Sequence, residues 1–92
     1  MLKIQGNDVM RGGTKVGYVT GNDIYDENGK KAGYFTSNDI YDERSRKRGY
    51  IEGNYLYLTE GGKINISENR RMISGGSLSD LARAAVRILL GD

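Results

Sequence analysis

Apolar and polar residues alternate in short segments along most of the chain, and glycine or asparagine separates one segment from the next. The segment 16–31 is followed at once by a near copy over 32–47, so the alternation recurs with a period of 16 residues. A third copy spans 48–63, and a copy that is one residue shorter opens the chain. Four copies of one unit therefore precede the C-terminal part.

Each copy is expected to form two strands and two turns. Alternation with a period of two indicates half-buried strands, and pairs such as Gly21-Asn22 and Asn28-Gly29 suit two-residue hairpin turns. At Gly12-Gly13 and Gly61-Gly62, a three-residue loop with a glycine bulge keeps the faces aligned. The sequence thus predicts a mainly β fold, in which the tandem hairpins form a curled antiparallel meander.

The register that such turns impose places similar side chains opposite one another. Across the Gly-Asn turns the predicted pairs are Val19 with Ile24, Phe35 with Ile40, Ile51 with Leu56, Tyr18 with Tyr25, Tyr34 with Tyr41, and Tyr50 with Tyr57. Across the other turns opposite charges meet, in the pairs Glu27 with Lys30, Asp26 with Lys31, Glu43 with Arg46, and Asp42 with Lys47. The last loop is expected to pair Leu58 with Ile64 and Leu56 with Ile66.

Strand alternation then divides the side chains between two faces. We expect one face to be buried, and it carries the aliphatic residues and Phe35: Ile4, Val9, Val19, Ile24, Phe35, Ile40, Ile51, Leu56, Leu58, Ile64, Ile66 and Ile73. We expect the other to be at least half exposed, and it carries Met10 and all seven tyrosines: Tyr18, Tyr25, Tyr34, Tyr41, Tyr50, Tyr55 and Tyr57.

A β-solenoid, in which each copy stacks on the next as one coil, is the alternative architecture. Stacking would place the turn asparagines in one ladder, but it would also place Asp26 over Asp42 and Lys31 over Lys47. Because like charges repel and the hairpin register pairs opposite ones, the sequence favours the meander.

The period changes after residue 74, where a helix is predicted. Ser77-Leu-Ser-Asp80 resembles a capping box, the helix is expected to run over 77–90, and Gly91 ends it. This amphipathic helix would be about 20 Å long, whereas ten strands spaced by about 4.8 Å make a flat sheet on the order of 43 Å wide. Residues 1–92 are thus expected to form one domain, whose sheet curls around the helix or buries its remaining aliphatic residues in a homodimer.

The amino-acid composition limits the catalytic and metal-binding chemistry that is open to the chain. The chain has no histidine and no cysteine, which removes thiolate and imidazole nucleophiles and tetrahedral zinc sites, so we expect no enzyme activity, no metal and no cofactor. The net charge of +2 is too small to indicate a nucleic-acid partner by itself. There is no long apolar stretch that could form a transmembrane segment or a signal peptide, so a cytoplasmic location is expected.

The candidate functional surface is the tyrosine-bearing side of the sheet. We interpret the chain as a non-catalytic interaction or scaffold protein that associates with itself and offers a partner Tyr18, Tyr25, Tyr34, Tyr41, Tyr50, Tyr55 and Tyr57, with Arg44 and Arg48. The alternative is a nucleic-acid-binding module that uses the same tyrosines with Arg44, Arg48, Arg70 and Arg71.

Two further possibilities are less favoured. The acidic turn 26–29 has some character of a calcium loop, but a type I′ turn explains the same residues. The helix could lie on a membrane with Arg83 and Arg87 toward lipid phosphates, although covering the sheet is its more ordinary use.

Overall fold

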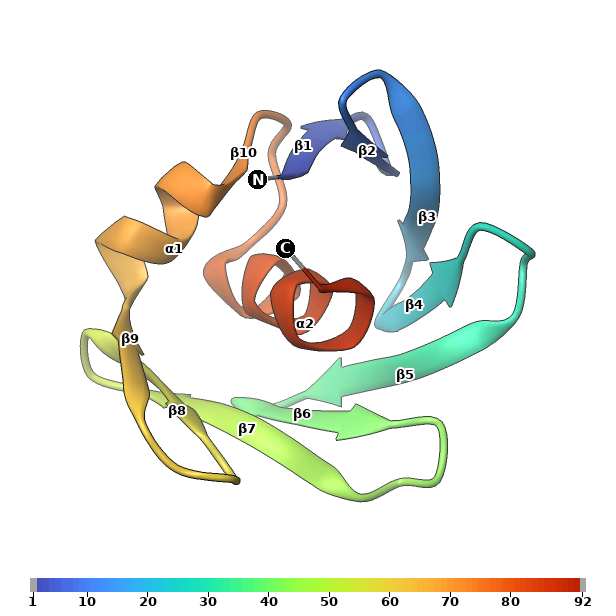
Figure 1. Cartoon of the computed structure of the whole chain (residues 1–92). Coiled ribbons are helices and arrows are strands. Elements are labelled where there is room, and N and C mark those ends of the chain that lie inside the picture. The colour runs from blue at the N-terminus through green and yellow to red at the C-terminus, as the bar shows by residue number, and fades with distance from the viewer. Residues whose placement is uncertain (1, 92) are drawn as a thin grey trace.

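A single ten-stranded sheet forms most of the computed structural model, which describes residues 2–91 (Figure 1). Its strands are β1 (Leu2–Gln5), β2 (Asp8–Arg11), β3 (Thr14–Thr20), β4 (Asp23–Asp26), β5 (Lys31–Thr36), β6 (Asp39–Asp42), β7 (Lys47–Glu52), β8 (Tyr55–Leu58), β9 (Lys63–Asn65) and β10 (Ile73–Ser74). Two helices, α1 (Ile66–Met72) and α2 (Asp80–Leu90), complete the fold.

The strands from β1 to β9 pair in sequence order and antiparallel, while β10 pairs parallel with β1. This arrangement confirms the predicted meander and rules out the solenoid, in which successive copies would stack. The sheet is open among the described residues, since β9 and β10 are its two ends and do not pair with each other. Helix α1 connects these two strands along the chain.

The register across the Gly-Asn turns is the predicted one in all three full copies. Tyr18 lies opposite Tyr25 and Val19 opposite Ile24, and the next two copies repeat both pairs. These turns need a positive φ at their first residue, which glycine adopts without strain, as at Gly21 with φ 58°. In the second copy Ser37 takes this conformation with φ 57°.

The acidic turns differ from the prediction, because each is a three-residue loop followed by a bulge. The N–H of Gly29 donates to the carbonyl of Asp26, and the N–H of Asp26 donates to the carbonyl of Lys30. The register then shifts between Ile24 and Tyr25, so that Tyr25 lies opposite Lys31. The loop after Asp42 has the same pattern. The predicted type I′ turn and the four predicted charge pairs beside these turns are therefore wrong.

The loop at Gly61-Gly62 has the expected three-residue form but another register, and the loop at Gly12-Gly13 departs from that form. Arg11 lies opposite Thr14, which leaves a two-residue turn at Gly12-Gly13, and the bulge falls deeper in the hairpin. In the last loop Leu56 lies opposite Ile64, a shift of two residues from the predicted pair. Because that shift is even, both side chains keep the face that the sequence assigned to them.

The aliphatic face forms the core, as predicted. Its residues are buried with the exception of Ile51, Leu58 and Ile64, which are part-buried and pack against the same cluster. Helix α2 contributes Ala82, Ala84, Ala85 and Val86, all at most 3% exposed. The core also holds Leu2, which the sequence analysis did not place there.

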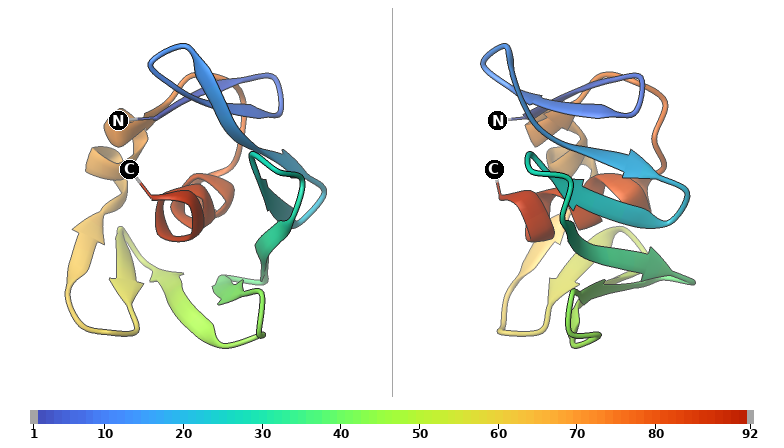
Figure 2. Two further views of the ribbon diagram at one scale, coloured as in Figure 1. Left: turned by 45° about the vertical axis from the view of Figure 1, so that its right-hand side comes forward. Right: turned by 90° about the vertical axis from the view of Figure 1, so that its right-hand side faces the viewer.

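Helix α2 occupies the middle of the molecule, with strands on several sides of it (Figures 1 and 2). Side chains of consecutive helical residues point about 100° apart. Yet Leu90, Leu89 and Ile88 meet the strand glycines of three successive copies, which are Gly17, Gly33 and Gly49. The three copies therefore lie on different sides of the helix.

Helix α2 begins later than predicted. Ser79, not Ser77, is the N-cap, and its hydroxyl accepts a hydrogen bond from the N–H of Ala82 at 3.1 Å. The Arg83 guanidinium faces the protein, because it donates to the carbonyl oxygens of Ile73, Gly76 and Leu78. This use of Arg83 leaves it unsuited to a lipid phosphate.

Helix α1 was not predicted, and Ile66 was assigned to a strand. The Asn65 side chain caps the helix by accepting from the N–H of Ser67 at 2.9 Å. Asn65 followed three residues later by Glu68 is a helix-start pattern that would have located it. Neither helix in the described part of the chain is long and apolar enough to cross a membrane.

Candidate functional site

The seven tyrosines lie together on the outer side of the sheet, which we call the tyrosine face. Three cross-strand pairs are stacked, with ring centroids 4.9 Å apart for Tyr18–Tyr25, 5.1 Å for Tyr34–Tyr41 and 5.2 Å for Tyr50–Tyr57. Their planes are within 19° of parallel. Tyr55 is tilted against Tyr57 with centroids 6.3 Å apart.

One lysine per copy covers a ring of this face. The ammonium nitrogen lies 5.0 Å from the ring centroid for Lys15 over Tyr18, 5.1 Å for Lys31 over Tyr34, 4.7 Å for Lys47 over Tyr50 and 4.4 Å for Lys63 over Tyr55. The first three lysines also pair at 3.1 Å with an aspartate, namely Asp8, Asp23 and Asp39 respectively. Each unit is thus a tyrosine pair with one ion pair above it.

A bulge creates each unit, after the acidic loop in the last two and between Val9 and Met10 in the first. Because the register shifts by one residue, Lys31 and not Ala32 lies opposite Tyr25 on the outer side. Ala32 then packs against the core cluster on the inner side. Sequence reasoning found the tyrosine pairs but missed the lysines, since the unshifted register assigns the lysines other partners.

Stacking and lysine cover make the tyrosine face less exposed than predicted, and every tyrosine is part-buried. One face of each paired ring is covered by its partner ring, and a lysine lies over one ring of each pair. Two hydroxyls already donate within the chain, from Tyr34 to Ser45 at 3.1 Å and from Tyr41 to Asp39 at 3.5 Å. The face is therefore a mixed apolar and polar surface.

The candidate arginines do not gather on the tyrosine face. Arg44 is exposed in the β6–β7 loop, next to the Ser45 that Tyr34 contacts. Arg48 follows that loop at the bulge and lines a pocket beside α2. Arg70 of α1 forms two hydrogen bonds of 2.7 Å with Asp80 of α2. Arg71 is exposed on α1, away from the β6–β7 loop (Figure 1).

The aspartate that closes the β6–β7 loop, Asp42, is buried and bonded to arginines of the same loop. Asp42 is 3% exposed, and its Oδ1 accepts from the N–H groups of Arg44 at 2.9 Å and Arg46 at 3.0 Å. The Arg46 guanidinium donates to Oδ2 at 3.1 Å. The backbone N–H of Arg46, with smaller contributions from Arg44 and the guanidinium, holds the pKa of Asp42 below its ordinary value although burial acts in the opposite direction.

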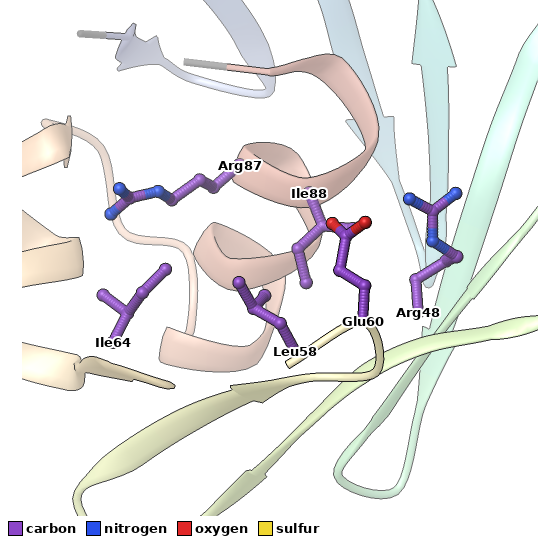
Figure 3. A pocket seen from close by; sticks show the side chains of 6 residues that line it. All are labelled: Arg48, Leu58, Glu60, Ile64, Arg87 and Ile88. Carbon is purple, nitrogen blue, oxygen red and sulfur yellow. The ribbon is translucent and has the colours of Figure 1, made fainter. Parts of the chain in front are cut away.

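The pocket beside α2 has a volume of about 250 Å³ and was not predicted (Figure 3). It is lined by Arg48, Leu58, Glu60, Ile64, Arg87 and Ile88. Within residues 2–91, no three acidic side chains converge in a way that would hold a metal ion. Comparison of the chain with protein-family models, curated proteins and solved structures finds no significant match.

Proposed function

We propose that this chain is a non-catalytic interaction protein that binds a partner protein through its tyrosine face. The observation that carries the proposal is the recurrence of one surface unit, a tyrosine pair with a lysine and an aspartate, in three successive copies. The opposite side of the same strands is occupied by the core. Tyrosine supplies a large contact area with a polar tip, which suits protein interfaces.

The charges of the face support a protein partner over a nucleic acid. Each lysine of the first three units already pairs with an aspartate at 3.1 Å, so few cations are free to replace phosphate counterions. Base stacking would require an open ring face, and lysines lie over the rings of Tyr18, Tyr34 and Tyr50. A protein surface of mixed charge can meet both the lysines and the aspartates.

The test reverses charges on the tyrosine face and compares them with equal changes elsewhere. The outer-face variant is Lys31→Glu/Lys47→Glu, and the matched control is Arg11→Glu/Arg71→Glu; all four residues are exposed. A protein captured by the immobilised chain from its native extract is purified, and calorimetry measures its affinity for each variant. We expect the outer-face variant to bind at least about tenfold more weakly, as for loss of central charged contacts, and the control to bind like wild type.

Two results would contradict the proposal. One is equal affinity of the purified partner for the wild type and the outer-face variant. The other is a chain that captures no protein and stays monomeric by light scattering at micromolar concentration, because a second copy is one possible partner. Fluorescence anisotropy with single-stranded oligonucleotides covers the alternative: affinity that falls steeply with salt would replace a protein partner by a nucleic acid.

A further inference from the structure

The pocket beside α2 lies where the third copy departs from the first two. At the bulge position, Val16 and Ala32 of the earlier copies are replaced by Arg48. At the end of the second strand, aspartate in the earlier copies is replaced by Leu58. The apolar and the charged positions are thus exchanged, which leaves an apolar floor beside a cation on the inner side of the sheet.

Arg87 supplies a second cation to this pocket. Its Nη1 donates to Oδ1 of Asn69 at 3.3 Å, and Asn69 is 2% exposed, so the guanidinium is held in place from the protein side. An arginine has five N–H donors, and no carboxylate forms an ion pair with Arg87 among residues 2–91. Arg48 has Asp42 at 3.8 Å.

The space between the two arginines is lined by apolar side chains and by the Glu60 carboxylate (Figure 3). In Figure 3, Arg87 stands on one side and Arg48 on the other, with Ile88 and Leu58 between them. Both of these apolar residues are part-buried, so they offer contact area to a ligand. In the same view the Glu60 carboxylate lies between Ile88 and Arg48, which makes the Arg87 end the more favourable one for an anion.

We propose that this pocket binds a small aliphatic carboxylate, with its carboxylate on Arg87 and its alkyl chain over Leu58, Ile64 and Ile88. At about 30 Å³ per water-sized group, the volume of about 250 Å³ holds roughly eight non-hydrogen atoms. Hexanoate has this size. Guanidinium groups bind carboxylates through parallel hydrogen bonds, and the apolar floor adds affinity only for a ligand that also carries an alkyl chain.

The test is an NMR titration of the whole chain with hexanoate, followed on the methyl groups of Leu58, Ile64 and Ile88. We expect saturable shifts with a dissociation constant of about 1 mM, as suits a ligand of this size. Acetate and inorganic phosphate, which lack the alkyl chain, and hexylammonium, which reverses the charge, are expected to cause no saturable shift at these methyl groups.

Variants separate the anion site from a general hydrophobic effect. Arg87→Gln is expected to weaken hexanoate binding at least about tenfold, as for the loss of a charged hydrogen-bond partner. Arg71→Gln, which removes the same charge outside the pocket, is expected to leave it unchanged. Glu60→Gln is expected to strengthen binding severalfold, because a carboxylate at the pocket rim repels the ligand.

The Arg87→Gln variant removes the hydrogen-bond donor of the buried Asn69 amide oxygen, so its folding must be checked separately. Circular dichroism reports the fold, and if that variant unfolds, Arg48→Gln and Glu60→Gln provide the test with opposite expected effects. The proposal is overturned if hexanoate causes no saturable shift in wild type, or if hexylammonium shifts the same methyl groups equally.

Discussion

Replacing Gly49 by alanine tests whether helix α2 rests directly on the backbone of the sheet. A Cβ atom at this position would lie 2.9 Å from Cδ1 of Ile88 and 2.8 Å from the carbonyl oxygen of Tyr57. Carbon atoms attract each other best at about 3.5–4.0 Å, so the end of the Ile88 side chain must turn away from the methyl group and the Tyr57 backbone must shift.

Two opposing effects determine how much Gly49→Ala changes the free energy of unfolding. Alanine stabilises a strand by about 0.5–1 kcal/mol relative to glycine, because glycine loses more backbone freedom on folding. Overpacking a closed core costs about 1–3 kcal/mol. We therefore expect Gly49→Ala to lower the free energy of unfolding by up to about 2.5 kcal/mol, and a chain of this size loses roughly 4–8 °C of melting temperature per kcal/mol.

A double-mutant cycle with Ile88→Val assigns the effect to the helix contact, since valine lacks the Cδ1 methyl group. Ile88→Val alone is expected to cost about 0.5–1.5 kcal/mol. In urea unfolding of the four proteins, the double variant should be more stable than the sum of the single effects predicts, by at least about 0.5 kcal/mol. A stabilising Gly49→Ala, or additive effects within about 0.3 kcal/mol, would refute the close seating of α2.

The structure also predicts the effects of substitutions at three other places. Ser37→Gly is expected to stabilise the chain by about 1 kcal/mol by removing positive-φ strain, and Gly21→Ser to destabilise it by a similar amount, both measured by urea unfolding. Arg83→Met should cost about 2–3 kcal/mol in the same assay, because three backbone carbonyls lose a charged donor. The hydrogen bonds from Arg70 hold the pKa of Asp80 below its ordinary value of 3.8, so the pair stabilises the fold fully above that pH and loses its effect as the pH falls below it. Melting temperatures should therefore fall less steeply below about pH 4 in Asp80→Asn than in wild type.

Strand pairing was predictable because two local signals agree. Alternation with a period of two assigns each side chain to a face, and the Gly-Asn turns fix which residues lie opposite each other. Any other register across Gly21-Asn22 would have paired a tyrosine with an aliphatic residue or lost the turn geometry. The tyrosine pairs of the candidate site followed from the same two signals.

The bulges were not predictable from charge complementarity, because two registers satisfy it. In the unshifted register Lys31 meets Asp26, and in the observed register it meets Asp23. In the observed register the Asp26 carboxylate accepts from the N–H groups of Asn28 and Lys30 and stabilises a three-residue loop, a form that the loop after Leu58 adopts without a carboxylate. A side chain that bonds its own backbone competes with a cross-strand partner, and pairwise charge counting omits that competition.

The packing of α2 on the aliphatic face was predicted, but which strand positions meet the helix was not, because sheet width and helix length alone do not locate the contacts. The dimensions of the molecule, 30 × 28 × 20 Å, are smaller than a flat ten-stranded sheet of about 43 Å in width. The same strand position is glycine in each full copy, at Gly17, Gly33 and Gly49. A glycine on the inner face leaves room for another backbone or side chain, so this repeated position could have indicated where α2 meets the sheet.

The same comparison of copies explains why the proposed ligand pocket occurs only once. In the second copy the inner position opposite Gly33 is Asp42, whose carboxylate closes its own loop and leaves no apolar floor. In the third copy Leu58 lies opposite Gly49, so the loop has no such carboxylate and the floor stays open to Ile88. The features that all copies share build the core and the tyrosine face, whereas the exchanged residues build the pocket on the opposite side of the strands. The proposed partner on the tyrosine face and the proposed carboxylate in the pocket would therefore contact different residues, so binding of one is expected to leave the site of the other open.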